Sequence, residues 1–208
     1  MDKSAKMNNI TFKQYRNIDL TIFSIILVLS EAVTTLATND WFVAQPIAIS
    51  TTMIFICMIM MRWGGYAIIP AALGGLVFCI ASSATLPQYL IYVVGNCGGL
   101  VSLLWFKFFK KEDVRKGPFK LTFFVITTYV SIQLARWVLS LPFGARPDTL
   151  LVYLGTDIIS LLFAAVIMLI MRNVDGMIED QKSYLFRLQR EKEEKNSPVQ
   201  PLGYGDED

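Results

Sequence analysis

Residues 51–83, TTMIFICMIMMRWGGYAIIPAALGGLVFCIASS, form a long apolar stretch whose main interruption is Arg62-Trp63-Gly64. Two apolar segments, 45–61 and 65–83, lie on either side of this break. Each is about 17 to 19 residues long, close to the length that a helix needs to cross roughly 30 Å of hydrocarbon. Because so short a break leaves no room for a loop, we expect the two segments to form a tight helical hairpin.

Four further apolar segments of similar length, 19–38, 87–108, 119–141 and 149–171, flank this hairpin. The chain is 54% hydrophobic and only 17% charged, whereas soluble domains contain about 25% charged residues. The sequence therefore predicts an all-α polytopic membrane protein with six transmembrane helices in one domain, 19–171. We also expect a cytoplasmic N-terminal segment at 1–18, a cytoplasmic helix at 172–196 and a disordered acidic tail at 197–208.

The basic residues predict the orientation of these helices. Seventeen of the 19 Lys and Arg residues lie before the first segment, at the hairpin turn, around the connection between the fourth and fifth segments, or after the sixth. The loops on the opposite side contain only Arg146. Because Lys and Arg concentrate in cytoplasmic loops, we expect a multi-pass plasma-membrane protein with both termini in the cytoplasm.

Composition also narrows the chemistry. The net charge of +2 follows from this topology, so no nucleic-acid partner is expected. The chain has no histidine, which excludes His-based catalytic triads, His metal sites and His proton relays. Cys57, Cys79 and Cys97 fall in three different segments without a CxxC motif, so we expect packing residues rather than disulfides. Neither a cofactor nor a metal is expected.

Five strongly polar residues lie inside the apolar segments: Glu31, Asn96, Gln133, Arg136 and Asp157. Counted at about 1.5 Å per residue, they fall in the outer half of the membrane although they come from four different helices. An ionised side chain inside a membrane normally faces the bundle interior or a water-filled cavity, because lipid cannot solvate it. The sequence therefore predicts that these side chains share one outward-facing pocket.

Aromatic residues accompany this polar group, as is usual in small-molecule pockets. Tyr92 precedes Asn96 by one helical turn, Tyr153 precedes Asp157 by one turn, and Trp41 lies in the loop at the pocket mouth. The predicted substrate-binding residues are Glu31, Trp41, Tyr92, Asn96, Gln133, Arg136, Tyr153 and Asp157.

Three alternatives compete with ligand binding at these positions. Arg136 has a side chain long enough to extend to the outer headgroups, or it forms a purely structural ion pair with Asp157 or Glu31. Trp41 is also typical of an interfacial aromatic residue. The carboxylates of Glu31 and Asp157 are too short to reach the headgroups, so either both are solvated in a cavity or one of them is protonated.

Small side chains recur every four residues in segment 65–83. Ala67, Ala71 and Gly75 begin this ridge, and Cys79 and Ser83 continue it. Small residues let membrane helices approach closely, because lipid offers no hydrophobic drive for helix association. The ridge indicates either packing within the chain or a docking face for another membrane protein.

The layout of residues 10–172 resembles the substrate-binding S components of energy-coupling factor (ECF) transporters, which are bacterial importers of vitamins and related micronutrients. The stretches that carry the resemblance are FKQYRNIDLTIFSIIL before and in the first segment, WGGYAIIPAALGGLVFCIAS in the third and QYLIYVVGNCGGL in the fourth. Members commonly carry Ala-x-x-x-Ala in the first segment to meet their scaffold. This chain lacks that pattern, which leaves the ridge at 65–83 as the expected docking face.

The resemblance implies a non-enzymatic subunit that captures a vitamin-like molecule and partners with a transmembrane scaffold and two ATPases. No GxxxxGK[ST] phosphate-binding loop occurs in the sequence, so ATP hydrolysis is expected in the partner subunits. The residues of the predicted pocket favour a neutral or cationic, nitrogen-rich heterocycle, and the lack of histidine argues against Co or Ni.

Two other functions fit the same sequence. A structural scaffold of envelope assembly would pair its buried polar groups and leave no cavity. An enzyme acting on lipid would use Asp157 or Glu31 as acid or base, although the chain shows no recognisable nucleophile and base constellation.

Overall fold

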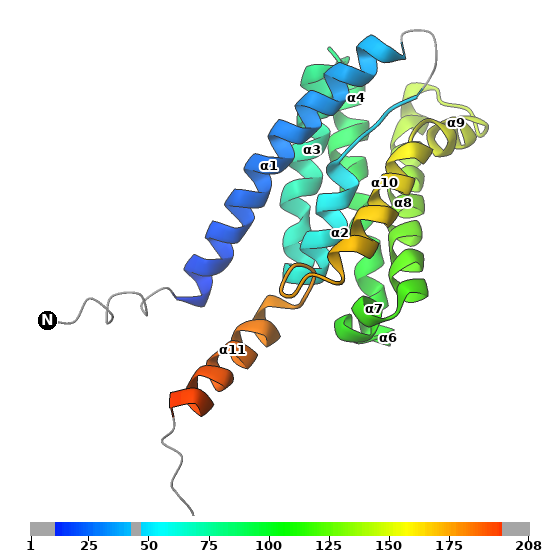
Figure 1. Ribbon diagram of the computed structural model, residues 1–208. Coiled ribbons are helices and arrows are strands. Elements are labelled where there is room, and N and C mark those ends of the chain that lie inside the picture. The colour runs from blue at the N-terminus through cyan, green and yellow to red at the C-terminus, as the bar shows by residue number, and fades with distance from the viewer. Residues whose placement is uncertain (1–10, 43–46, 197–208) are drawn as a thin grey trace, which may run out of the picture.

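The computed structural model describes residues 11–42 and 47–196, and every regular element in these ranges is a helix (Figure 1). By length and composition, four helical stretches could cross a membrane: Phe12–Trp41, Thr52–Ala81, which includes both arms of a hairpin, Leu86–Phe108 and Pro118–Phe143. The bent pair Thr149–Thr156 and Ile158–Met171 provides a fifth if its halves form one span. The chain is therefore an all-helical protein with the apolar helices of a membrane protein. The predicted tail 197–208 and residues 1–10 of the predicted N-terminal segment lie outside the described residues.

Helix α1 (Phe12–Trp41) begins seven residues before the predicted span. The Thr11 hydroxyl accepts a hydrogen bond from the Gln14 amide, and the Gln14 side chain accepts one from the Thr11 amide. This capping box satisfies two of the amides that a helix N-terminus leaves without partners. No helix breaker follows between residues 12 and 18, so the polar residues that we assigned to an N-terminal segment belong to α1.

The hairpin predicted for residues 45–83 is present, with a later start. Helix α2 (Thr52–Trp63) ends at Gly64, whose positive φ of 62° turns the chain through a short 3₁₀ helix, η2 (Gly64–Ala67), into α3 (Ile68–Ala81). A Cβ added to Gly74 would lie 2.0 Å from Thr52 Oγ1, so α3 runs back alongside α2. Residues 47–51 are not helical, and we call them the 47–51 segment.

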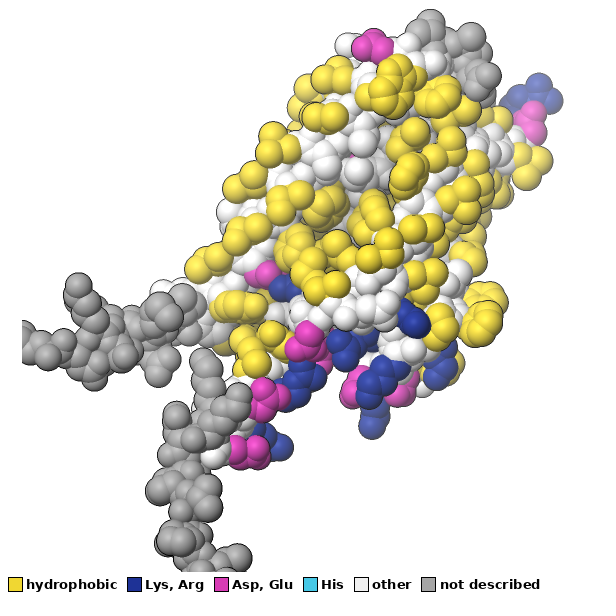
Figure 2. All heavy atoms as spheres, viewed as in Figure 1, with side chains coloured by type: hydrophobic (Ala, Val, Ile, Leu, Met, Phe, Trp, Pro, Cys, Tyr) yellow, Lys and Arg dark blue, Asp and Glu magenta, His cyan; other side chains and the backbone are white. Residues whose placement is uncertain are grey.

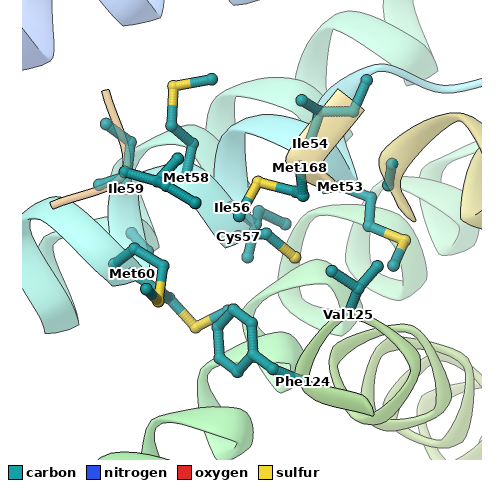
Figure 3. Packing of buried hydrophobic residues seen from close by; sticks show 14 of the residues in the cluster. Met53, Ile54, Ile56, Cys57, Met58, Ile59, Met60, Phe124, Val125 and Met168 are labelled. Carbon is teal, nitrogen blue, oxygen red and sulfur yellow. The ribbon is translucent and has the colours of Figure 1, made fainter. Parts of the chain in front are cut away.

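All 12 residues of α2 are buried, and this helix forms the centre of the bundle. Figure 3 shows its Met and Ile side chains packed against Phe124 and Val125 of α8 (Pro118–Ser140) and Met168 of α10 (Ile158–Met171). Unbranched methionine side chains adapt to irregular gaps between helices. The uniformly apolar sequence of residues 53–61 thus reflects contact on every side of the helix.

The segment Leu86–Phe108, which corresponds to the predicted span 87–108, changes its helix type along its length. It comprises α4 (Leu86–Tyr89), a π-helical turn η3 (Leu90–Val94), α5 (Gly95–Cys97), a 3₁₀ helix η4 (Gly98–Leu104) and α6 (Trp105–Phe108). A Cβ on Gly98 would lie 2.3 Å from the Ala135 Cβ, so its glycines let this segment approach α8 closely. π-Helical turns frequently occur at functional sites, and this one precedes Asn96.

The predicted span 149–171 is not one straight helix. Helix α9 (Thr149–Thr156) and α10 meet at a 44° bend at Asp157. The remaining elements are α7 (Lys111–Lys116), the 3₁₀ turn η5 (Leu141–Phe143) and α11 (Gln181–Asn196), which extends away from the bundle. The predicted helix at 172–196 therefore begins only at Gln181.

The surface separates apolar from charged residues. In Figure 2, apolar side chains cover the flank of the bundle, while most Lys, Arg, Asp and Glu side chains gather at the end where α6, α7 and α11 lie. Exposed apolar residues include Ile22, Leu29 and Val33 on α1 and Leu162 and Val166 on α10. An apolar flank of this kind suits contact with lipid.

At the charged end, Arg62 ties α1 to the hairpin turn and to the chain before α11. Its Nη2 and Nε donate to the Asp19 carboxylate at 2.6 and 3.0 Å, and its Nη1 donates to the carbonyls of Gly176 and Met177 at 2.5 and 2.8 Å. The Trp63 indole also donates to Asp19 at 2.5 Å. One buried guanidinium thus joins three parts of the chain.

We expect Asp19→Asn to lower the free energy of unfolding by about 1–3 kcal/mol, because hydrogen bonds to charged groups contribute about that much. The matched control is Asp148→Asn, since Asp148 pairs with Arg146 at 3.6 Å with both side chains largely exposed. Exposed pairs contribute little, so the control should unfold like the wild type in a denaturant titration in detergent. Equal stability of the two variants would contradict a structural role for the Asp19 pair.

The small-residue ridge packs within the chain. Ala67, Ala71 and Gly75 are all buried, and a Cβ on Gly75 would lie 2.7 Å from the Tyr92 carbonyl oxygen. These residues are therefore not available to a partner, and the expectation that they form a docking face is wrong. Their size matters because α3 packs directly against the backbone of η3.

Gly75→Ala is expected to lower the free energy of unfolding by about 1–3 kcal/mol, the usual effect of overpacking. Backbone atoms of Tyr92 and Val93 occupy the space that the new methyl group needs. Gly155→Ala serves as control, because nothing lies within 4 Å of a Cβ there, and alanine favours a helix by up to about 1 kcal/mol. Thermal unfolding of the two variants should shift in opposite directions, and a neutral Gly75→Ala would refute the close approach.

Candidate functional site

Arg136 of α8 and Asp157 at the α9–α10 bend form an ion pair inside the bundle. Arg136 Nη1 donates to Asp157 Oδ2, and only 6% and 8% of the two residues are exposed. The bend puts Asp157 at the end of one helix and the start of the next. Because the guanidinium is buried and paired, the alternative in which Arg136 extends to the headgroups is excluded in this structure.

Two amide side chains, Gln133 and Asn96, form hydrogen bonds with this ion pair. Gln133 donates from Nε2 to Asp157 Oδ2 at 3.0 Å and accepts from Arg136 Nη1 at 3.2 Å. Asn96 Oδ1 accepts from Arg136 Nε at 3.2 Å and from Nη2 at 2.8 Å, and its Nδ2 donates to the Ala71 carbonyl at 3.3 Å. The network therefore joins α3, α5, α8 and the α9–α10 bend.

Tyr92 adds an aromatic face to the network. The Arg136 guanidinium carbon lies 4.7 Å from the centroid of its ring, a distance at which a cation and an aromatic ring attract. A Cβ on Gly95 would lie 2.6 Å from Arg136 Cγ. The absence of a side chain at Gly95 thus leaves room for the arginine between η3 and α8.

Glu31 of α1 is fully buried and accepts four hydrogen bonds from the 47–51 segment and the start of α2. The Ser50 hydroxyl donates to Oε1 at 2.8 Å, and the Thr51 amide, the Thr51 hydroxyl and the Thr52 amide donate to Oε2 at 2.8–2.9 Å. Amides at a helix N-terminus favour a negative charge. This carboxylate therefore caps α2 and fixes the position at which the helix begins.

The 47–51 segment also connects to the α9–α10 bend. The Ser50 amide donates to Ser160 Oγ at 2.8 Å, and the Ala48 amide donates to the Thr156 carbonyl at 3.0 Å. The segment thus lies between Glu31 on one side and the neighbours of Asp157 on the other. Sequence reasoning did not single out Ser50, Thr52 or Ser160, because hydroxyl residues are common in membrane helices and need no special explanation.

A small void separates the Glu31 contacts from the Arg136 network. Its volume is about 10 Å³, which is at the lower limit for a single water molecule. The Thr52 hydroxyl on its border is buried without a hydrogen-bond partner in the described part of the chain. The residues that line it are Ser50, Thr52, Met53, Asn96, Tyr129, Ile132, Gln133, Arg136, Asp157 and Ser160.

The structure brings most of the predicted site residues together. Asn96, Gln133, Arg136 and Asp157 form one network, Tyr92 covers its arginine, and Glu31 lies on the other side of the void through Ser50 and Thr52. The other two predicted residues do not join it.

Trp41 ends α1 and is 74% exposed. Tyr153 is half-buried, and no hydrogen bond joins its hydroxyl to the network within residues 11–42 and 47–196. Neither side chain contributes a hydrogen bond to the network in the described part of the chain.

The protein itself supplies partners for the three ionisable groups of the site. Arg136 and Asp157 neutralise each other, and the carboxyl oxygens of Glu31 accept hydrogen bonds from four donors. Among the described residues, no three His, Cys, Asp or Glu side chains are grouped so that they could hold a metal ion. The arrangement is suited to polar recognition and contains no evident nucleophile with an adjacent base.

Comparison of the chain with profiles of known protein families, with curated protein sequences and with solved structures finds no match.

Proposed function

We propose that this chain is the membrane-embedded substrate-binding subunit of an ECF-type importer and captures a vitamin-like small molecule at the Arg136 network. The observation that carries the proposal is the convergence of Asn96, Gln133, Arg136 and Asp157 from different helices around one void, with Glu31 bonded to Ser50 on the border of that void. Charged residues inside a membrane protein are expensive and normally mark a substrate or ion site. Apolar residues of similar volume would hold the helices together at no greater cost.

The proposed topology has six membrane passes with both termini in the cytoplasm of the plasma membrane. The proposed six passes are α1, α2, α3, the segment 86–108, α8 and the bent α9–α10 pair, with α2 and α3 counted as separate passes. The basic residues of the sequence supply the direction, and the charged end in Figure 2 is then cytoplasmic. The network lies toward the other end, so the site serves solutes from outside the cell.

Capture of a ligand requires the network to open. The void of about 10 Å³ is far smaller than the roughly 300–1,000 Å³ of a usual small-molecule pocket. The 47–51 segment covers the network between α1 and α10, and its displacement would expose both carboxylates. The proposed importer therefore alternates between this closed arrangement and an open one, while a scaffold and two ATPases supply the energy.

The test is to purify the full-length protein from membranes of its host in mild detergent and to identify what accompanies it. We expect a small molecule released by solvent extraction and co-isolated ATPase subunits, both detectable by mass spectrometry. Absence of the small molecule, together with failure to recover the ATPase subunits, would refute the importer proposal.

A second function, a structural scaffold of envelope assembly, is favoured by one observation. The buried polar groups of the network pair with one another, and the void between them is too small for a ligand. Recovery of cell-wall synthesis proteins in the same purification, without a small molecule or ATPases, would support this function instead.

A further inference from the structure

The hydrogen bonds of the network determine which kind of molecule can replace its internal contacts. Arg136 has five N–H donors, and four of them are used: one on Nε, two on Nη1 and one on Nη2. The remaining Nη2 donor finds no acceptor within the described residues. Breaking the pair with Asp157 would free a second donor on the same guanidinium.

Asp157 shows the complementary pattern. Both of its hydrogen bonds, from Arg136 and Gln133, reach Oδ2. Its Oδ1 accepts none from the part of the chain that the structure describes, although Asp157 borders the void. Arg136 therefore keeps one unused donor on Nη2, and Asp157 keeps one unused acceptor, Oδ1. The two side chains that carry them are already paired with each other.

The carboxyl group of Glu31 already has its hydrogen-bond partners within the protein. Four donors already surround its carboxylate, so it needs no positive charge from a ligand. The charged groups that line the void are then the Arg136 guanidinium and the Asp157 carboxylate. A ligand that separates them must compensate both, because a buried charge without a partner is strongly unfavourable.

We infer, on the basis of the proposed function, that the ligand is a small zwitterion with a carboxylate for Arg136 and an ammonium group for Asp157. The ligand carboxylate takes the place of Asp157 at the guanidinium, and the ligand ammonium takes the place of Arg136 at Oδ1 and Oδ2. Tyr92 lies beside the guanidinium and offers an aromatic surface to the adjoining part of the ligand. The sequence favoured a neutral or cationic heterocycle, and the pairing in the structure adds the requirement for zero net charge.

Ligands with a net charge are disfavoured for the same reason. A cation would satisfy Asp157 and leave Arg136 without an acceptor of opposite charge, and an anion would do the reverse. The closed network, in which the protein supplies both partners itself, would then be the more stable arrangement.

Matched triplets of probes test this requirement. Each triplet contains an amino acid, its amide, which is a net cation, and its N-acetyl derivative, which is a net anion. Thermal unfolding of the purified full-length protein in detergent is recorded with each compound in millimolar excess, because a ligand that binds only the folded state raises the midpoint. We expect at least one amino acid to raise it by several degrees, and its two derivatives to leave it unchanged.

The variant Arg136→Gln with Asp157→Asn provides the specificity control, because it removes both charges and keeps hydrogen-bonding groups at both positions. It should unfold cooperatively and show no shift with the amino acid that stabilises the wild type. An equal shift in this variant would overturn the assignment of the site.

The outcomes separate this inference from the function on which it rests. No shift with any amino acid, or a larger shift with an amide or N-acetyl compound, overturns the zwitterion. A co-purified molecule with a net charge also overturns it and leaves the importer proposal standing. Absence of both a co-purified molecule and ATPase partners refutes the importer itself.

Discussion

Arg136→Gln and Asp157→Asn are each expected to destabilise the protein strongly when made singly, and much less when made together. Removing one partner of a buried ion pair costs about 3–5 kcal/mol, because the other charge stays buried without compensation. The two residues are only 6% and 8% exposed and contact each other directly. In the double variant no charge is left alone, so we expect it to lie within about 2 kcal/mol of the wild type.

The measurement is the free energy of unfolding of all four proteins in a denaturing-detergent titration, which yields the coupling energy of the pair. Additive effects of the two substitutions would show that the charges do not interact in the folded protein. Ligand retention then separates the two proposed functions. A folded double variant that loses a co-purified molecule supports binding, whereas a double variant with full cellular function supports a purely structural pair.

The sequence was sufficient to predict an all-helical chain with long apolar helices and the members of the polar network. An ionised side chain in an apolar segment is costly enough that it must find partners, so the positions of Glu31, Arg136 and Asp157 indicated a shared interior. The same reasoning could not decide between a pocket and an ion pair. That choice depends on the bend at Asp157 and on the side-chain conformation of Arg136, and residue types do not specify either one.

Helix boundaries were predictable where a local signal exists. The capping box of Thr11 and Gln14 is visible in the sequence, although the span prediction, based on hydropathy, placed it outside the helix. The late start of α2 had no such signal, because its cap is a carboxylate from another helix, Glu31. The prediction of a docking face on the ridge at 65–83 was wrong for a related reason. Small residues favour close packing, but they do not specify whether the neighbouring helix belongs to the same chain.

Glu31→Gln should release the 47–51 segment and lower the free energy of unfolding by about 3 kcal/mol or more. The carboxylate accepts four hydrogen bonds, and bonds to a charged group contribute about 1.5–3 kcal/mol each. Glutamine has the same shape but offers a single acceptor oxygen, and its NH₂ group would face amides that also donate. Donors around the carboxylate therefore lose their partner while the packing volume stays unchanged.

Thr35→Val is the matched control for this substitution. Thr35 is buried one turn after Glu31, and its hydroxyl has no hydrogen-bond partner in the described residues. Valine should therefore leave the stability unchanged or raise it, because an unsatisfied buried hydroxyl is unfavourable. Hydrogen–deuterium exchange read by mass spectrometry then reports the local effect. In Glu31→Gln the amides of Thr51 and Thr52 should exchange faster while the middle of α8 stays protected, and in Thr35→Val neither region should change. Unaltered protection of Thr51 and Thr52 in Glu31→Gln would mean that the carboxylate does not hold this segment, and the network would then have to open by another route.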